Sequence, residues 1–280
     1  MNPAYFSYIL ALLLFGSNGI NASQIELGSI EIVFYRTLIG SVLLISVFLL
    51  SKRLWSFYKH KLQFFFLTLS GMAMGASWLF LYEAYQQIGV SVSSMLYYCG
   101  PIIVMVLSPI LFKENLVLRK IFGFLCVFTG ILLVNGKLVS TGNHIFGIFC
   151  GVMSAVMYSF MVIFNKKAAN ISGLENSLLQ LTISFLTVAV VTLFRKNLTL
   201  SVPKSSILPL IFLGLVNTGL GCYLYFSKLD KLPVQSVSIL GYLEPLSAVL
   251  LSVMILQEHM TFVQVLGALL MLGGAVYSET

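Results

Sequence analysis

Three charged side chains lie well inside long apolar stretches of the sequence, namely Arg36, Glu83 and Glu244. A charge at the centre of a membrane helix costs at least about 2.5–3.5 kcal/mol, so each of the three needs a physical reason. Arg36 could bind a carboxylate, pair with Glu83, or extend its guanidinium toward the membrane interface. Glu244 could exchange a proton, bind a cationic group of a substrate, or cap polar backbone. These residue types indicate a polar site inside an apolar chain.

Pro101 and Pro245 each interrupt a long apolar stretch, and Pro245 directly follows Glu244. Inside a helix, proline removes an i to i−4 hydrogen bond, which would free the carbonyls of Tyr97 and Gly241. In hydrocarbon such carbonyls need partners, and neighbouring helices, water or a substrate can supply them. The two prolines are therefore candidate hinges for a rocking motion, with a static kink that improves packing as the alternative.

Polar and aromatic side chains accompany these charges. Trp78 and Tyr82 lie at i and i+4, on one helical face, where they could hold a cation or an aromatic group or could anchor the helix at the interface. Tyr98 and Tyr242 lie deeper in their stretches, which favours a cavity. The candidate substrate-binding or coupling residues are Asn18, Arg36, Trp78, Tyr82, Glu83, Tyr98, Tyr158, Asn217, Tyr242 and Glu244.

The composition identifies the solvent around most of the chain. Of its 280 residues, 59% are hydrophobic and 9% are charged, and the mean hydropathy is +0.99. Soluble domains have about 45–50% apolar and about 25% charged residues, so this surface must be covered largely by lipid. The net charge of +7 comes from basic residues between the apolar stretches, which favours a membrane cause over nucleic-acid binding.

Ten apolar segments are long enough to cross the roughly 30 Å hydrocarbon core of a bilayer. Their connections are short, which leaves no room for a separate soluble domain. We therefore expect an all-α membrane protein with ten transmembrane helices. The predicted spans are 5–22, 30–51, 63–86, 91–112, 117–135, 144–165, 174–194, 207–227, 233–256 and 261–278.

Basic residues are distributed unevenly between the two sides of this arrangement. If the amino terminus is cytoplasmic, the inner connections hold Lys52, Arg53, Lys59, Lys61, Lys113, Arg119, Lys120, Lys166, Lys167, Lys228 and Lys231. The outer connections then hold only Lys137, Arg195, Lys196 and Lys204. By the positive-inside rule, we expect a multi-pass protein of the cell membrane with both termini cytoplasmic.

The chain also repeats itself at a fixed offset of 144 residues. Matches between apolar residues could be coincidental, but proline, glutamate, tyrosine and glycine also match. These pairs are Tyr98/Tyr242, Pro101/Pro245, Glu114/Glu258, Gly75/Gly219, Gly123/Gly267 and Gly130/Gly274. Each repeat holds five spans, an odd number, so the second must enter the membrane in the opposite orientation. Two inverted repeats, 1–137 and 138–280, are typical of secondary transporters.

The fifth and tenth spans have few polar side chains at their centres, and each carries two glycines seven residues apart on one face. Small residues let membrane helices approach closely, so we expect packing helices away from the pathway that could also form a homodimer contact. Glu114 and Glu258 are expected in loops, where each would cap or orient the start of the fifth or tenth span.

The motifs resemble the EamA repeat of the drug/metabolite transporter superfamily, over essentially the whole chain. The first copy is Tyr98-Cys-Gly-Pro101 through Phe112-Lys-Glu114, then Gly123 and Gly130; the second is Leu243-Glu-Pro245 through Leu256-Gln-Glu258, then Gly267 and Gly274. Phe15-Gly-Ser-Asn18 and Arg36 resemble the opening signature of that family. The resemblance implies a ten-span transporter of small metabolites, often an exporter of amino acids or related compounds. The copies differ at Gly100 and Glu244.

Other function classes lack their motifs. The sequence has no phosphate-binding Gly-x-x-x-x-Gly-Lys-Ser/Thr loop, no His-Glu-x-x-His and no Asp-rich diphosphate site, and its histidines, His60, His144 and His259, lie in predicted loops. We therefore expect neither an enzyme nor a cofactor or metal site. A channel remains an alternative, and it would show uncoupled flux without saturation.

The expected function is a secondary transporter that moves a small metabolite by alternating access. Arg36 favours a carboxylate such as an amino acid, whereas the glutamates and aromatic residues keep a cationic amine or quaternary ammonium compound as the alternative. Glu244 could also carry a coupling proton.

Overall fold

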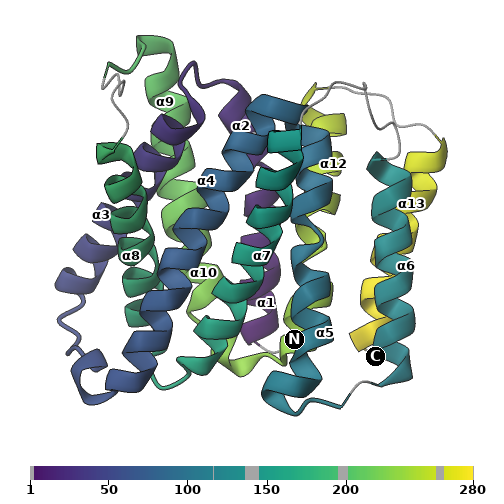
Figure 1. Ribbon diagram of the computed structural model, residues 1–280, viewed down its shortest axis with the longest axis horizontal. Coiled ribbons are helices and arrows are strands. Elements are labelled where there is room, and N and C mark those ends of the chain that lie inside the picture. The colour runs from purple at the N-terminus through teal and green to yellow at the C-terminus, as the bar shows by residue number, and fades with distance from the viewer. Residues whose placement is uncertain (1–2, 116, 136–144, 195–200, 257–261, 280) are drawn as a thin grey trace.

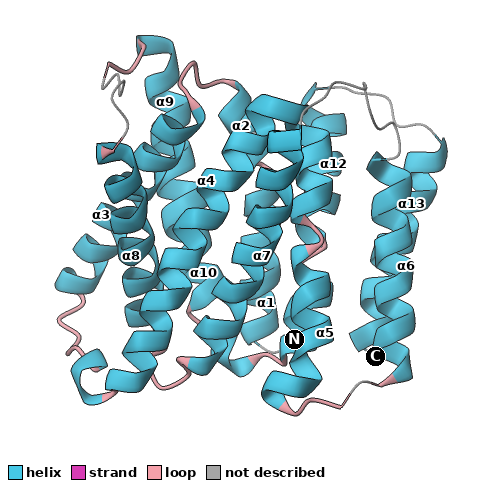
Figure 2. Ribbon diagram, in the orientation of Figure 1, coloured by secondary structure: helices cyan, strands magenta, loops and turns pink. Residues whose placement is uncertain are grey.

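A computed structural model describes residues 3–115, 117–135, 145–194, 201–256 and 262–279. Every regular element in these ranges is a helix (Figure 2), so the predicted all-α class is confirmed for the described residues. The helices are α1 (Pro3–Gly16), α2 (Asn18–Ser23), α3 (Ser29–Leu50), α4 (Lys61–Tyr97), α5 (Gly100–Phe112), α6 (Leu118–Asn135), α7 (Ile145–Lys167), α8 (Gly173–Leu193), α9 (Lys204–Phe212), α10 (Gly221–Phe226), α11 (Val234–Leu240), α12 (Leu243–Leu256) and α13 (Phe262–Glu279). Three short elements join them: the 3-10 turns η1 (Phe57–Lys59) and η3 (Leu229–Lys231), and the π-helix η2 (Leu213–Leu220).

Helical segments long and apolar enough to cross a bilayer make up much of the described chain. Six meet this criterion, and shorter apolar helices occupy Gly100–Phe112 and Val265–Ser278. The long segments are Pro3–Ser23, Ser29–Leu50, Lys61–Gly89, Ile145–Lys167, Gly173–Leu193 and Lys204–Lys231. The helices run roughly parallel in one bundle, and both chain ends lie at its lower end in Figure 1.

Several predicted spans are divided by breaks. The predicted span 91–112 consists of the last turns of α4, a break at Tyr98 and Cys99, and α5. The expected connection before it is a kink inside α4 at Gly89, where φ is +78°, a backbone conformation that glycine adopts readily. The span 233–256 divides in the same way into α11 and α12.

The prolines have a different local effect from the one predicted. Pro101 and Pro245 lie in the first turns of α5 and α12, where a helix has no need of the missing N–H, so they begin new helices instead of bending one helix. The Gly241 carbonyl, expected to be free, accepts the N–H of Glu244 at 3.2 Å. The chain therefore breaks about one turn before each proline.

Helices α6 and α13 stand side by side at one edge of the bundle (Figure 1) and pack through their glycines. A Cβ atom at Gly123 would lie 2.6 Å from the Gly274 carbonyl oxygen, and one at Gly130 would lie 2.5 Å from the Gly267 carbonyl oxygen. The glycines therefore permit backbone contact between these two helices, as the glycine spacing predicts for packing helices.

Glu114 does not cap the helix that follows it, and that prediction was wrong. Its carboxylate accepts the backbone N–H groups of Val234 at 2.8 Å and Gln235 at 3.1 Å, at the start of α11. Residues 234 and 235 are buried, so without Glu114 these amides would lack an acceptor. Glu258 and the predicted repeat boundary at 137/138 lie outside the described residues.

Candidate functional site

A central cavity lies among α1, α2, α3, α4, α7, α10 and α12. It has two adjoining parts, the Arg36 compartment of about 80 Å³ and the Tyr158 compartment of about 40 Å³. A single water needs roughly 10–15 Å³ of such volume, so the cavity is large enough for a few waters or a small solute. Both compartments are lined by Phe15, Asn18, Trp78, Tyr97 and Glu244.

Helix α3 presents Arg36 to this cavity from its buried face. Val33, Arg36, Gly40 and Leu44 recur at helical spacing and are all buried in the bundle. A Cβ atom at Gly40 would lie 3.0 Å from Thr218 Cγ2 and 3.2 Å from the Gly214 carbonyl oxygen. The glycine thus brings α3 close to η2 and places Arg36 one helical turn away from this contact.

The Arg36 side chain is 1% exposed, and its hydrogen-bond partners are neutral groups. Its Nε donates to Thr218 Oγ1 at 2.9 Å, one terminal nitrogen to the Tyr82 hydroxyl at 2.6 Å and the other to Asn18 Oδ1 at 3.4 Å. The guanidinium carbon also lies 4.5 Å from the centre of the Trp78 ring, a cation–π distance. Among the described residues no carboxylate forms an ion pair with it.

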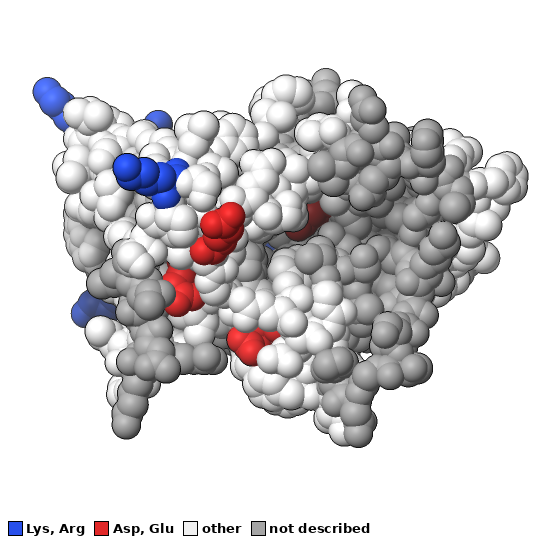
Figure 3. All heavy atoms as spheres, turned by 90° about the horizontal axis from the view of Figure 1, so that it is seen from above, with Lys and Arg blue, Asp and Glu red and all other residues white. Residues whose placement is uncertain are grey.

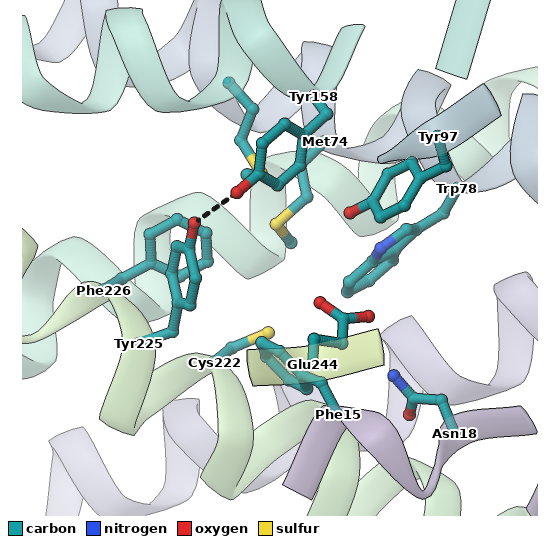
Figure 4. A pocket seen from close by; sticks show the side chains of 11 residues that line it. Phe15, Asn18, Met74, Trp78, Tyr97, Tyr158, Cys222, Tyr225, Phe226 and Glu244 are labelled. Atoms are coloured by element: carbon teal, nitrogen blue, oxygen red, sulfur yellow. Dashed lines mark hydrogen bonds between the residues drawn. The ribbon is translucent and has the colours of Figure 1, made fainter. Parts of the chain in front are cut away.

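Glu244 reaches the same cavity from the first turn of α12. Figure 4 shows its carboxylate directed into the space between Trp78, Cys222 and Asn18. It is half-buried, and within the described chain it receives no hydrogen bond and forms no ion pair, including with Arg36. A Cβ atom at Gly16 would lie 2.9 Å from the Glu244 carbonyl oxygen, so glycine at this position lets α1 approach the start of α12.

The structure brings most of the predicted site residues together. Seven of them line the cavity, namely Asn18, Arg36, Trp78, Tyr82, Tyr98, Tyr158 and Glu244. The shared face predicted for Trp78 and Tyr82 is also found, since both rings lie over the Arg36 guanidinium.

Three predicted site residues lie elsewhere. Glu83 lines a separate apolar cavity of about 240 Å³ and accepts from Ser29 and Gln87, so it does not pair with Arg36. Asn217 donates to Leu14 O and Ser17 Oγ at the break between α1 and α2, and does not line the cavity.

Tyr242 is the third of these residues, and the interpretation of its side chain as part of the cavity was wrong. It is buried among residues of α11, α12, α6 and α13, and its hydroxyl donates to the Tyr98 carbonyl at 3.0 Å. The Tyr242 ring lies deep in its span, as expected, but it packs against apolar side chains and not into the cavity.

Residues that were not predicted complete the site. Thr218 holds Arg36, while Tyr85 and Tyr225 line the two compartments. Tyr225 belongs to a chain of hydroxyls at the lower end of the cavity: it lies 3.3 Å from the Tyr158 hydroxyl and 3.4 Å from that of Tyr8. Residue type alone could have suggested the tyrosines, because a phenol deep in a membrane span needs a partner.

The upper end of the molecule, opposite the chain ends, carries a hollow. Figure 3 shows that this end is hollowed near its middle and that acidic side chains lie around the hollow. At the lower end, the tyrosine chain is joined to α11, because Tyr8 also donates to the Val237 carbonyl at 2.9 Å.

Comparison with known families agrees with this arrangement. The EamA-like transporter family matches residues 2–136 and again residues 145–279, which together cover nearly the whole chain. The chain belongs to the EamA-like transporter family. The resemblance predicted from the motifs is thereby confirmed, and this EamA-like protein is a multi-pass membrane transporter.

Individual relatives support the same assignment. The "Uncharacterized transporter YxxF" of Bacillus subtilis (strain 168) is 23% identical over 276 residues, covering 98% of this chain and 88% of that protein. The "Uncharacterized transporter YoaV" of the same organism is 25% identical and covers 85% and 83%, respectively. A solved crystal structure superimposes with a TM-score of 0.84 over 99% of this EamA-like chain and 98% of its own; at 17% identity this likeness shows the fold alone.

Proposed function

We propose that this EamA-like protein is a secondary transporter that binds the carboxylate of a small metabolite at Arg36 and exports it by alternating access. The observation that carries the proposal is a guanidinium buried to 1% exposure beside a cavity, without a carboxylate partner in the described chain. Leaving a buried charge unpaired is unfavourable, so an anionic group entering the cavity would be strongly attracted.

The hydrogen-bond count of Arg36 supports a carboxylate in particular. Its guanidinium has five N–H groups, and the three contacts with Thr218, Tyr82 and Asn18 use one on each nitrogen. One hydrogen therefore remains on each terminal nitrogen. Two such donors on one planar group match the two oxygens of a carboxylate.

Glu244 narrows the class of metabolite to a zwitterion such as an amino acid. It lines the same cavity as Arg36 but forms no ion pair in the described chain, so its carboxylate can bind an ammonium group while Arg36 binds the carboxylate end. The alternative substrate, a cationic amine or quaternary ammonium compound, is supported by the aromatic rings of Trp78 and Tyr97 beside Glu244.

Ten spans in two inverted repeats remain the proposed architecture. The contact of Gly123 with Gly274 becomes the contact of Gly267 with Gly130 when each residue is replaced by its repeat partner. Such exchange is what a two-fold relation between the halves requires. The repeat also matches Glu31 with Glu175, and each lies in the first turn of its helix, α3 or α8.

We also propose that both termini lie on the cytoplasmic side of the cell membrane. The positive-inside distribution supports this orientation, and the position of both ends at the lower end of the bundle agrees with an even number of spans. Cysteines placed at Lys59 and Lys137 should react with an impermeant reagent from opposite sides. Reaction from the same side would rule out the ten-span arrangement.

Alternating access needs halves that move relative to each other. The breaks before Pro101 and Pro245 lie at matching positions and leave α5 and α12 joined to the preceding helices by single non-helical turns. These points are the proposed hinges. Glu244 is the proposed site of a coupling proton, and a homodimer through α6 and α13 stays a prediction that cross-linking in membranes would test.

The test is a flux assay with purified protein in proteoliposomes. A panel of amino acids, other small carboxylates and cationic amines is loaded, and counterflow of labelled solute is measured. A transporter shows saturable counterflow, whereas a channel shows flux that rises linearly with concentration. Counterflow of amines alone would replace the carboxylate proposal by its alternative.

A further inference from the structure

The π-helix η2 lies directly behind Arg36. Elements of this kind are rare and occur mostly as single wide turns within α-helices, frequently at functional sites. Here η2 follows α9, and its Asn217 and Thr218 side chains are both fully buried. Each of these two neighbouring residues bonds to a different part of the cavity wall.

Thr218 has a hydroxyl whose direction is set by the π-helix. It donates to the Leu213 carbonyl, five residues earlier, at 2.8 Å, and it accepts from Arg36 Nε at 2.9 Å. A hydroxyl has only one hydrogen, so the bond to Leu213 leaves its lone pairs for Arg36. The wide turn thus supplies an acceptor for Arg36 Nε. When a substrate binds to both terminal nitrogens it does not also contact Nε, so the partner of Nε has to come from the protein.

Asn217, the residue before Thr218 in η2, bonds to the break between α1 and α2. Its amide donates to Leu14 O at 3.0 Å and to Ser17 Oγ at 2.7 Å, at the break that precedes Asn18. Asn18 is itself the acceptor for one terminal nitrogen of Arg36. One turn of η2 therefore orients Arg36 directly through Thr218 and indirectly through the break that carries Asn18.

We propose that Thr218 is a positioning residue for carboxylate recognition, because the π-helix presents its hydroxyl to Arg36 Nε and so directs the two terminal nitrogens toward the cavity. This inference rests on the proposed function for its effect on binding. Its structural part, the constraint of Thr218 on the guanidinium, stands independently of any substrate.

The substrate-independent test uses the small number of arginines. The chain has four, Arg36, Arg53, Arg119 and Arg195, so arginine labelled with ¹⁵N gives few Nε signals. The Arg36 signal is identified as the one missing from Arg36→Lys. Its Nε–H should exchange slowly with water in the wild type and in Thr218→Ser, and quickly in Thr218→Val and Thr218→Ala.

The binding test compares amino acids with their carboxamides, which keep the ammonium group and lack the carboxylate. A hydrogen bond to a charged group contributes more free energy than one between neutral groups. Its loss in Thr218→Val should therefore weaken amino-acid binding about tenfold or more. Carboxamide binding should change little, and Thr218→Ser should restore the wild-type ratio. A general loss of folding would lower both affinities together.

Thr192→Val is the matched control, because Thr192 is also buried and, within the described residues, its hydroxyl bonds to Val188 O of its own helix α8 and not to Arg36. It should leave the exchange rate and both affinities unchanged. The inference is overturned if Arg36 Nε–H exchanges equally slowly in Thr218→Val and Thr218→Ala. It is also overturned if Arg36→Ala abolishes amino-acid binding while Thr218→Val leaves it intact. Failure of the wild type to bind any amino acid would instead contradict the proposed function.

Discussion

The carboxylate of Glu114 and the backbone amide of Val234 are 120 residues apart in sequence and 2.8 Å apart in space. Glu114 follows α5 in the first repeat, and Val234 begins α11 in the second. Helix α11 also carries Val237, whose carbonyl accepts the hydroxyl of Tyr8. Glu114 therefore holds the start of the helix to which the tyrosine chain is bonded.

Glu114→Gln should weaken this attachment and make the lower end of the cavity more accessible. The variant replaces one carboxylate oxygen by an NH₂ group, which cannot accept the second buried amide and costs about 1–3 kcal/mol in the closed state. Cys222 lines the Tyr158 compartment and is fully buried. With the other cysteines replaced by alanine, Cys222 should react faster with a charged thiol reagent added from the side of the chain ends.

Glu26→Gln is the control for this experiment. It makes the same chemical change at an exposed residue away from α11. It should leave the Cys222 rate at the wild-type value. Equal rates in all three proteins would show that Glu114 has no part in closure.

Gly130→Ala should destabilise the protein without altering the cavity. The new methyl group would lie 2.5 Å from the Gly267 carbonyl oxygen and force α6 away from α13, at a cost of about 1–3 kcal/mol. Gly273→Ala, in the neighbouring helix, meets no atom within 4 Å and should not destabilise. Thermal unfolding in detergent measures both, and a lower stability for Gly273→Ala than for Gly130→Ala would contradict the packing.

Glu244→Gln should separate binding from coupling. The amide cannot take up and release a proton, so a variant with an intact cavity should retain substrate counterflow and lose accumulation driven by a pH gradient. Proteoliposomes with and without an imposed gradient measure the two quantities. Undiminished accumulation in the variant would exclude Glu244 as the proton carrier.

Much of the site follows from residue type and membrane depth alone. Arg36 and Glu244 stand out because an apolar segment tolerates a charge only for a reason, and both line the cavity. The rings of Trp78 and Tyr82 followed from their spacing of four residues. These predictions need only the position of a residue within its own helix, which the sequence spacing gives directly.

Features that depend on contacts between distant segments were harder to predict. Thr218 is an ordinary threonine in sequence, and only the π-helix and the approach of Gly40 bring it to Arg36. Glu114 was expected at the start of the next helix in its own repeat, because no local signal shows that its carboxylate reaches the start of α11 instead. Tyr242 matches Tyr98 in the repeat, yet apolar neighbours from α6 and α13 surround it.

The central claim is that Arg36 binds the carboxylate of the substrate. The most direct measurement is equilibrium binding of the amino acids transported by the wild type, and of their carboxamides, to purified Arg36→Gln. Losing one charged, bidentate contact should weaken amino-acid binding at least about tenfold and bring it close to the affinity of the carboxamide. An unchanged preference for the amino acid over its carboxamide in a folded Arg36→Gln protein would contradict the account.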